Sequence, residues 1–405
     1  MMRYWEMELD VCTPLFIGSG EKITILDYVY QSSNGMVYML DEAKWASFLK
    51  RAGRMNDFAS QVALGKCSSL YSKRFSRDSK RFSRDSYLGD HGELAARLHT
   101  SDIVMELKRR GVFHEGIPAY VTGKNPNDIV TFARNGLGER YIPGSSLKGA
   151  FRTAILAYVL LNIDRTKCYN KLEHATRNAV DETMDDVEKY LGIRIDKDGK
   201  YDMVNSRFKG LTVSDAKLID ETAAIVQKWD LSLTKSQSEK KPNYLPIYRE
   251  AIVPATKAVF TIGIDGSERG MGEIGVKTAG NLLHALSVFR DLQYKTYKEA
   301  IDKVYKGSVD HSVFRYLDEL NEANLVLGGG TGYISKTLIY PIAGSREKGK
   351  SIARKILSEQ FDRPGRKYDH KHRYDDIISP HTLKLTKSND MHMMGLCNIK
   401  VVKEL

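Results

Sequence analysis

The most informative stretch of the sequence is Pro143-Gly144-Ser145-Ser146-Leu147-Lys148-Gly149-Ala150-Phe151-Arg152. Either serine can act as the N-cap of a helix, because its side-chain oxygen accepts a hydrogen bond from a free backbone N–H group. Apolar residues then recur at intervals of three and four, which places them on one face of the helix. The pattern therefore predicts a long helix with one face in the core, formed by Leu147, Ala150, Phe151, Ala154, Ile155, Tyr158 and Val159.

The start of this helix also predicts a phosphate-binding site. Lys148 and Arg152 are four residues apart and therefore share one face close to the N-terminus. Free backbone N–H groups and the helix dipole favour an anion at the same end. The alternative is a capped core helix with two solvated cations. The candidate phosphate contacts are Gly144, Ser145, Ser146, Lys148 and Arg152.

A second candidate site is the glycine-rich run between Leu327 and Tyr333. Glycine permits positive φ and close approach of a ligand to the backbone. The run resembles a P-loop, but Ser335 replaces the glycine before the lysine, and Pro341 would interrupt the helix that must follow. A nucleoside triphosphate site is therefore disfavoured, and polynucleotide contact or a tight glycine turn remains open. The candidate RNA contacts are Gly328, Gly329, Gly330, Thr331, Gly332, Tyr333 and Lys336.

A third candidate is the basic stretch from Arg366 to Tyr374, which contains His370 and His372. Histidine can ligate a metal or act as a general acid and base, whereas alternating cations and tyrosines suit contacts to RNA. The sequence offers no recognisable second set of metal ligands and no Ser/His/Asp or Cys/His set. We therefore expect no catalytic residue, no metal and no cofactor, and we predict that Lys371 and Arg373 contact RNA.

The rest of the chain mixes strand and helix patterns. Residues Tyr4 to Val11 alternate apolar and charged side chains, which predicts a half-buried strand. The runs Ile23 to Val29 and Met36 to Leu40 flank the turn signal Asn34-Gly35 and predict a β-hairpin. Residues Met393 to Val402 can supply a closing strand. Because strands and helices do not alternate regularly, the sequence indicates an α+β protein with antiparallel sheets.

The composition is that of a soluble globular protein. The 405 residues include 62 Lys and Arg against 51 Asp and Glu, which gives a formal net charge of +11. The longest apolar run, Ala154 to Leu161, is far shorter than the roughly 20 residues that a membrane helix needs. The four cysteines are scattered singly, as in reduced proteins, so we expect a cytoplasmic protein without membrane contact.

One internal duplication stands apart from these motifs. Ser72 to Asp78 is copied as Ser79 to Asp85, and each copy combines lysine, arginine and a single phenylalanine. Seven residues are too few for a solenoid repeat. The pattern favours a solvated basic face or a mobile loop, although interleaved cations and aromatic rings also suit contacts to single-stranded nucleic acid.

Taken together, the motifs resemble the RAMP superfamily of CRISPR proteins. The resemblance rests on the helix start at 143–152, the strand with Val213-Ser214-Asp215, and the glycine-rich loop. Within that superfamily, the loop with Ser335-Lys336-Thr337 and the ending Pro380 to Leu385 with Met394 to Cys397 are similar to the cap subunits of type III-A Csm effectors. The 72–85 duplication fits no pattern of the family.

The resemblance implies a fold of two ferredoxin-like (RRM-like) RAMP modules with long helical insertions. We expect the first module at 1–245, with insertions near 50–110 and 165–205, and the second at 246–405 with the glycine-rich loop. The RNP1 signature of true RRM proteins is missing. The expected mode of RNA recognition is therefore contact with phosphates and sugars rather than stacking of bases on the sheet.

The resemblance also implies a non-catalytic, RNA-binding ribonucleoprotein subunit in antiviral defence. It would cap the backbone filament at the 3′ end of the crRNA and support maturation of that end. Its partners would be the crRNA, the backbone and small subunits of the Csm complex, and host nucleases that trim the RNA. Two alternatives remain open: a metal-independent crRNA-processing endoribonuclease with His370, His372 or His114 as general base, and a scaffold that binds only proteins.

Overall fold

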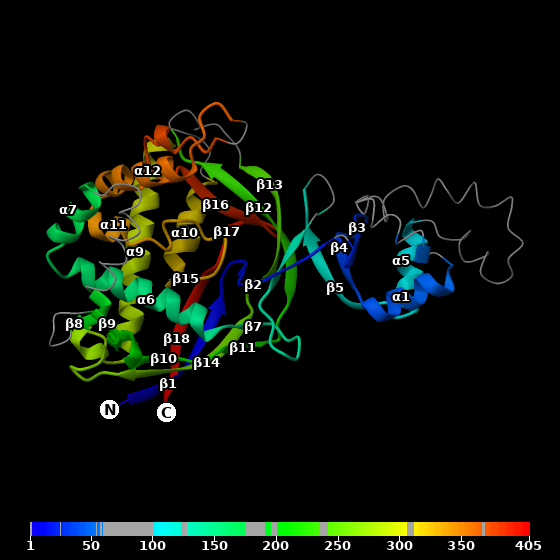
Figure 1. The fold of residues 1–405 in the computed structure, drawn as a ribbon, viewed down its shortest axis with the longest axis horizontal. Helices are drawn as coiled ribbons and strands as arrows, with labels where there is room; N and C mark the ends of the chain where they lie inside the picture. The colour runs from blue at the N-terminus through cyan, green and yellow to red at the C-terminus, as the bar shows by residue number, and fades with distance from the viewer. Residues whose placement is uncertain are drawn as a thin grey trace, which may run out of the picture.

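The computed structural model contains two main β-sheets and several helices (Figure 1). The 72–85 duplication and much of the predicted 50–110 insertion lie outside the residues that the structure describes. Within those residues, no helix is long and apolar enough to cross a membrane. The described residues are 2–24, 26–53, 55–56, 59, 100–122, 126, 128–174, 191–195, 201–234, 242–305, 312–366 and 369–405.

The first sheet is built around the N-terminal strand. Strand β1 (Met2–Val11) pairs antiparallel with both β14 and β18, so that Met7 faces Phe260 on one side and Val401 on the other. The alternation predicted for Tyr4 to Val11 is confirmed, because every second residue from Trp5 to Val11 is buried. The remaining strands are β7 (Tyr141–Ile142), β10 (Leu211–Val213), β11 (Ala216–Ile219), β14 (Lys257–Asp265), β15 (Leu325–Val326) and β18 (Leu396–Glu404).

The second sheet contains the predicted hairpin. Strand β3 pairs with β4 through the turn at Asn34-Gly35, as predicted, but β3 begins at Tyr28 and not at Ile23. The side chain of Asp27 accepts hydrogen bonds from Thr24, and this local turn separates Ile23 from the hairpin. The strands are β2 (Gly18–Ile23), β3 (Tyr28–Gln31), β4 (Met36–Leu40), β5 (Phe113–Tyr120), β6 (Ile129–Phe132), β12 (Ala223–Ser232), β13 (Asn243–Ile252), β16 (Thr382–Lys387) and β17 (Met391–Met393).

Helices α6 (Gly144–Leu161) and α9 (Ala279–Val304) pack beside the first sheet and contribute to the largest hydrophobic cluster (Figure 1). The predicted helix after Pro143 is therefore confirmed. In the predicted helical insertion after residue 165, the structure describes one helix and a separate two-stranded sheet, β8 (Ile193–Ile195) with β9 (Tyr201–Ser206). The other helices are α1 (Glu42–Arg51), α5 (Thr100–Arg109), α7 (Thr166–His174), α10 (Phe314–Glu322), α11 (Ile339–Ala343) and α12 (Arg346–Phe361).

A buried ion-pair network connects the two sheets. Glu250 on β13 is fully buried, and its Oε1 accepts hydrogen bonds from Arg134 at 2.6 Å and from Arg140 Nε at 2.7 Å. Its second oxygen accepts from the backbone N–H of Phe132 at 2.8 Å. Arg140 precedes β7 of the first sheet and also donates to Glu115 on β5 of the second.

Both sheets take strands from either side of residue 245. The first joins β1 and β11 to β14 and β18, and the second joins β12 to β13 and β16. The mixture of helices with two curled sheets confirms the predicted α+β class and its two ferredoxin-like modules. The division of the chain at residue 245 stays a prediction.

Candidate nucleic-acid interface

The start of α6 is held by a carboxylate from a neighbouring turn. The backbone N–H of Gly144 donates to Asp215 Oδ1 at 2.7 Å. Pro143 occupies the N-cap position, and no side chain at that position caps the helix, so the prediction that Ser145 or Ser146 caps it is wrong. A proline before the first helical residue leaves the capping role to an acceptor from elsewhere, and Asp215 fills it.

Glycine is required at position 144 because the backbone before Asp215 packs closely against it. A Cβ atom at this position would lie 2.5 Å from the carbonyl oxygen of Val213 and 2.7 Å from that of Ser214. The two sequence motifs, the helix start and Val213-Ser214-Asp215, are therefore parts of one packing arrangement. Because Asp215 already places a negative charge at this end of the helix, an RNA phosphate would have to share the helix N-terminus with this carboxylate.

Lys148 and Arg152 share a helix face, as predicted, but neither lines the cleft described below. The guanidinium of Arg152 lies over the ring of Phe208, 5.7 Å from its centre. Lys148 is partly buried, and this burial lowers the pKa of its amine. A spacing of four residues predicts a shared face but not which neighbour that face meets.

The glycine-rich loop packs tightly against the protein's own strands. Gly328, Gly330 and Gly332 have positive φ values, and the N–H of Gly329 donates to Phe16 O at 2.7 Å. A Cβ atom on Gly328 would lie 2.2 Å from the same carbonyl oxygen. The alternative of a tight glycine turn therefore explains Gly328. Glycine is needed there because the carbonyl group of Phe16, and not a ligand, approaches the backbone closely.

The P-loop alternative remains disfavoured in the structure. Helix α11 begins at Ile339 and spans only five residues, so no long helix follows Lys336. The hydroxyl of Ser335 donates within the loop, to Gly332 O at 2.9 Å, and also lies 2.9 Å from Thr331 Oγ1. Thr331 is buried, and Tyr333 packs partly against the core.

A cleft of about 400 Å³ brings the first two candidate motifs together. Ser146 and Gly149 from α6 form one wall, and Gly328 and Gly329 form another. Lys336 also lines the cleft and is exposed. A volume of this size is typical of sites that hold a small ligand or one unit of a polymer. The cleft is therefore the strongest candidate for contact with RNA.

The loop side of the cleft is electropositive. Burial lowers the pKa of Lys336, and the positive charge of Arg249 adds to this effect. The guanidinium of Arg249 stacks over the ring of Phe16 at 5.4 Å, and burial lowers its pKa as well. Two cations that repel each other and are partly desolvated gain from a bound anion.

Sequence reasoning missed three residues of this region: Arg249, Arg290 and Gln293. Arg290 and Gln293 line the cleft from α9, and Arg249 lies beside the glycine-rich loop. Periodicity in α9 indicates its buried face, but no local signal shows that this face meets a loop more than thirty residues later in the chain.

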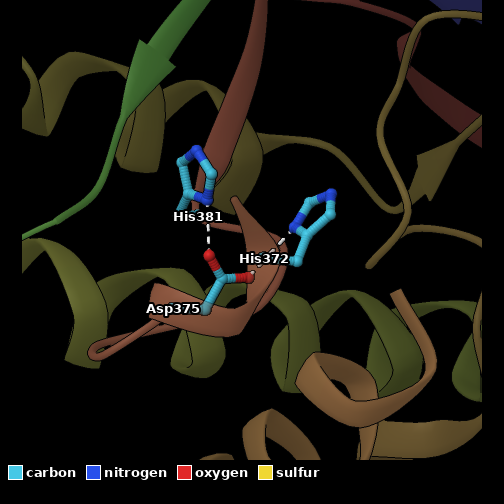
Figure 2. Close-up of side chains that lie close together, drawn as sticks. All are labelled: His372, Asp375 and His381. Carbon is cyan, nitrogen blue, oxygen red and sulfur yellow. Dashed lines mark hydrogen bonds and ion pairs between the residues drawn. The ribbon is translucent and has the colours of Figure 1, made fainter. Parts of the chain in front are cut away.

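His372 of the third candidate stretch belongs to a cluster of histidine and aspartate side chains (Figure 2). Asp375 is fully buried, and its two oxygens lie 3.2 Å from His372 Nδ1 and 2.5 Å from His381 Nδ1. The hydroxyl of Ser379 donates to the same carboxylate at 2.5 Å. Burial alone would raise the pKa of Asp375, but these hydrogen bonds outweigh it and lower the pKa.

These three side chains could hold a transition-metal ion, because one ligand atom from each lies within 4.8 Å of the others. They could equally act as paired imidazoles oriented by one carboxylate. His370 is exposed and stacks on His372, with ring centres 5.9 Å apart. The sequence concealed this cluster because Asp375 and His381 lie beyond the basic stretch. His114, the other histidine proposed as a base, is exposed on β5 and takes no part in the cluster.

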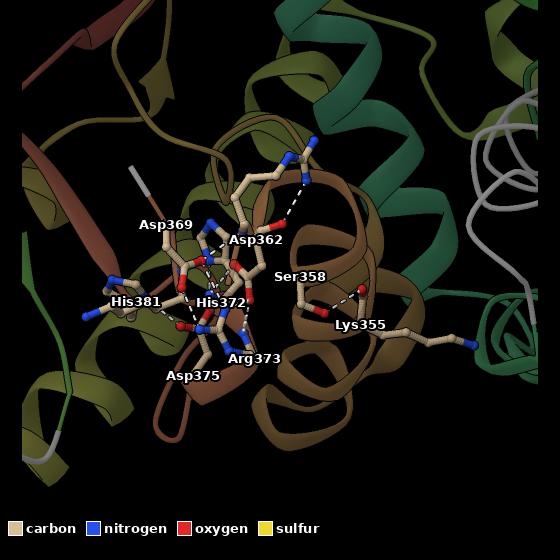
Figure 3. Close-up of polar contacts among 10 residues, drawn as sticks. Lys355, Ser358, Asp362, Asp369, His372, Arg373, Asp375 and His381 are labelled. Carbon is tan, nitrogen blue, oxygen red and sulfur yellow. Dashed lines mark hydrogen bonds and ion pairs between the residues drawn. The ribbon is translucent and has the colours of Figure 1, made fainter. Parts of the chain in front are cut away.

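The two cations predicted to contact RNA in this stretch differ in their surroundings, and Figure 3 shows those of Arg373. Arg373 is paired within the chain, at 2.5 Å to Asp369 and 3.2 Å to Asp362. Its guanidinium holds the pKa of Asp369 well below the ordinary value. Lys371 is exposed and has a positive φ of 59°. Lys371 therefore remains available to RNA, whereas Arg373 already supports the loop.

Comparison with known proteins gives a consistent result. A sequence model of the RAMP superfamily matches residues 8–363. The "CRISPR system Cms protein Csm5" of Streptococcus thermophilus is 28% identical over 375 residues, which cover 88% of this chain and 87% of that protein. The protein of the same name from Methanocaldococcus jannaschii is 23% identical, over 87% of this chain and 77% of that protein.

Two solved structures share the fold. One is a chain of a cryo-EM structure of a Csm-crRNA-target RNA ternary complex in a type III-A CRISPR-Cas system, with a TM-score of 0.61 and 19% identity. That alignment covers 98% of this chain and 100% of the other. The second is the crystal structure of T. onnurineus Csm5, with a TM-score of 0.56 and 18% identity over 96% of this chain and 99% of that one.

Proposed function

This chain belongs to the RAMP superfamily of CRISPR proteins, and from that premise we propose that it is a non-catalytic, RNA-binding subunit of a type III-A Csm effector complex. Its relatives carry the name of a Csm protein, and one structural neighbour is part of a complex with crRNA and target RNA. The proposed partners are therefore the crRNA and the backbone and small subunits of that complex.

The observation that carries the proposal is the cleft between α6 and the glycine-rich loop. Two motifs separated by almost 180 residues meet there, and Lys336 lies at the same place. Backbone N–H groups of glycine-rich turns and a nearby lysine are a common means of binding phosphates without reading sequence. A guide-binding subunit needs this property, because guide sequences vary.

The position at the 3′ end of the crRNA is the finer part of the proposal. A subunit at the end of a filament contacts one neighbour and leaves its opposite face open to trimming nucleases. The chain would then set the length of the mature RNA by covering a fixed number of nucleotides. This role supports antiviral defence without a catalytic residue in the chain.

The test is a comparison of RNA binding among three variants. We expect Lys336→Ala to weaken binding of single-stranded RNA and to lower the slope of log Kd against log salt by about 0.7, the value for one phosphate contact on a single strand. The double change Lys148→Ala with Arg152→Ala tests the two cations of α6 that the sequence favoured and that do not line the cleft. Lys50→Ala, an exposed residue of the distant helix α1, is the control and should leave the slope unchanged.

Each outcome has a clear reading. A smaller slope only for Lys336→Ala assigns RNA to the cleft, and a smaller slope only for the double variant assigns it to Lys148 and Arg152. If none of the four proteins binds RNA, the chain is a protein-binding scaffold and the RNA-binding proposal is wrong, whereas equal non-zero slopes would place the RNA away from both sites.

A second candidate function rests on the cluster of His372, Asp375 and His381. Two imidazoles oriented by one carboxylate are suited to acid and base catalysis of RNA cleavage without a metal. The test is incubation of end-labelled RNA with and without chelator, followed by a denaturing gel. Intact RNA supports the non-catalytic subunit, and cleavage that survives chelator and is lost in His381→Ala supports the ribonuclease.

A further inference from the structure

The cleft contains a buried amide without a partner. Gln293 on α9 is only 3% exposed and lines the cleft. Among the residues that the structure describes, its side chain makes no hydrogen bond, although the amide offers two donor hydrogens and one acceptor oxygen. Polar side chains in a protein interior are nearly always paired. An unpaired amide that faces a cleft therefore indicates a missing ligand.

Arg290, one helical turn before Gln293, provides a second unpaired group. Its Nη1 donates to Asn321 Oδ1 at 3.0 Å and also to the carbonyl oxygen of that residue. Its Nε is buried and has no partner among the described residues. The Nη2 atom also lies 3.2 Å from the carboxylate of Asp291, so Nε is the donor of this guanidinium that lacks a partner among the described residues. Both unpaired groups belong to residues that line the same cleft.

The other walls near Gln293 are apolar. Leu286 and Phe289 on α9 and Ala154 on α6 are buried and line the cleft. Apolar walls with a small number of polar groups at one point are characteristic of pockets that take a flat, partly polar ligand. The proposed phosphate-binding features, Lys336 and the amide of Gly328, lie on the loop side.

We propose that this cleft takes one unstacked nucleobase of the bound RNA, with the edge of the base hydrogen-bonded to Gln293 and Arg290. The inference rests on the proposed RNA-binding function and adds to it a pocket for a base. The ribose and phosphate would remain at the loop, near Lys336 and the glycines. The RNA would therefore be anchored at one nucleotide, whereas its other contacts are limited to the backbone.

The chemistry favours a base over a phosphate at Gln293. A neutral amide offers both a donor and an acceptor, and this pair matches the alternating groups on the edge of a base. A phosphate has only acceptors, so it would leave the amide oxygen unpaired. Single-stranded RNA is commonly read in this way, by splaying out a base and bonding to its edge.

The experiment compares RNA with and without bases, on the full chain. The probes are a 12-nucleotide single-stranded RNA and an abasic 12-mer with the same number of phosphates, titrated against the wild type and Gln293→Leu. We expect the wild type to bind the base-containing RNA about tenfold more tightly than Gln293→Leu does, as for loss of a bidentate base contact. We expect both proteins to bind the abasic RNA equally.

A matched control uses Thr296→Val on the same helix. Thr296 is buried like Gln293, but its hydroxyl donates to Leu292 O at 2.7 Å and it does not line the cleft. The control should bind both RNAs like the wild type. Repeating the titration with oligomers of A, U and C shows whether the pocket prefers one base, and that preference should disappear in Gln293→Leu.

A stability measurement excludes a merely structural role for Gln293. Because its amide has no partner, replacement by leucine should leave the thermal midpoint unchanged or raise it. Weaker RNA binding together with undiminished stability supports the pocket. A lower midpoint, or equal base discrimination in both proteins, would overturn the inference.

The two proposals fail in different ways. If the wild type binds both RNAs with a normal salt slope but without any difference between them, the base pocket is wrong and the RNA-binding function stands. If the wild type binds neither RNA, the proposed function is wrong and the pocket with it.

Discussion

At the scale of single residues, the glycines of the loop serve the protein's own packing before they serve a ligand. Gly328 combines a positive φ of 87° with a carbonyl oxygen in the place of a Cβ atom. Gly365 has a similar φ of 76°, but nothing lies within 4 Å of its missing Cβ. Substitution at Gly365 therefore tests backbone strain alone, whereas substitution at Gly328 tests strain together with a clash against Phe16.

We expect Gly365→Ala to lower the free energy of unfolding by about 1 kcal/mol, from strain alone. Gly328→Ala should cost about 3 kcal/mol or more, since strain is joined by a steric clash with backbone that cannot easily move. Urea denaturation of both variants checks the difference. Equal losses would show that the loop can shift away from Phe16, and the packing argument would then fail.

The buried carboxylate of Asp375 provides a prediction with a pH dependence. Because its folded pKa lies below the unfolded value, the stability that it contributes is present above the unfolded pKa and is lost as the pH falls through the folded pKa. At pH 7, Asp375→Asn should lower the free energy of unfolding by about 3 kcal/mol.

The measurement is urea denaturation of Asp375→Asn and the wild type between pH 7 and pH 3. Below about pH 4, the ordinary value for aspartate, the difference in stability between the two proteins should shrink. A difference that stays constant down to pH 3 would mean that folding does not lower the pKa of Asp375.

At the scale of elements, helix α6 shows what a local pattern can and cannot predict. Its apolar spacing predicted the helix and its core face, because a period of 3.6 residues is set by the backbone itself. The pattern could not reveal the cap, since Asp215 is brought to Gly144 by a turn between β10 and β11. Nor could it reveal that Ser146 and Gly149, rather than Lys148 and Arg152, face the cleft.

We expect Asp215→Ala to lower the free energy of unfolding by about 1 kcal/mol, the usual effect of losing an N-cap acceptor. Ser145→Ala is the matched test of the residue that the sequence favoured. Ser145 is exposed and does not cap the helix, so its replacement should change the thermal midpoint very little. If Ser145→Ala destabilises the protein more than Asp215→Ala does, Ser145 and not Asp215 caps the helix.

The site was predicted in its parts but not in its assembly. Helix start, glycine-rich loop and Lys336 were each visible in the sequence, because glycine, proline and lysine have strong local preferences. Gln293, Arg290 and Arg249 were not, because their importance depends on contacts between distant segments. Of the three residues in the histidine and aspartate cluster, the sequence analysis named His372 and missed Asp375 and His381.

At the scale of the whole molecule, the network around Glu250 joins the two sheets. Glu250 is fully buried and holds Arg134 and Arg140, so its loss would leave the buried Arg140 with only the partly exposed Glu115 and Glu221 as partners. By contrast, the pair of Arg3 and Glu404 is half exposed. The burial of an ion pair should therefore affect its contribution to the free energy of unfolding more than its geometry does.

We expect Glu250→Gln to lower the free energy of unfolding by about 3 to 5 kcal/mol, as for removing one partner of a buried pair. Glu404→Gln should cost less than about 1 kcal/mol. Urea denaturation measures both. If Glu250→Gln proves as mild as the surface variant, the two sheets do not depend on this network.

The order of strands in the first sheet has a consequence for how the protein is made. Strand β1 lies between β14 and β18, so it is translated long before either of its neighbours. Until β18 has been translated, one hydrogen-bonding edge of β1 is open, and an open edge can pair with another nascent chain. A truncated product that lacks β18 would keep this edge exposed and would tend to aggregate. Only a chain that contains β18 can close this edge of β1.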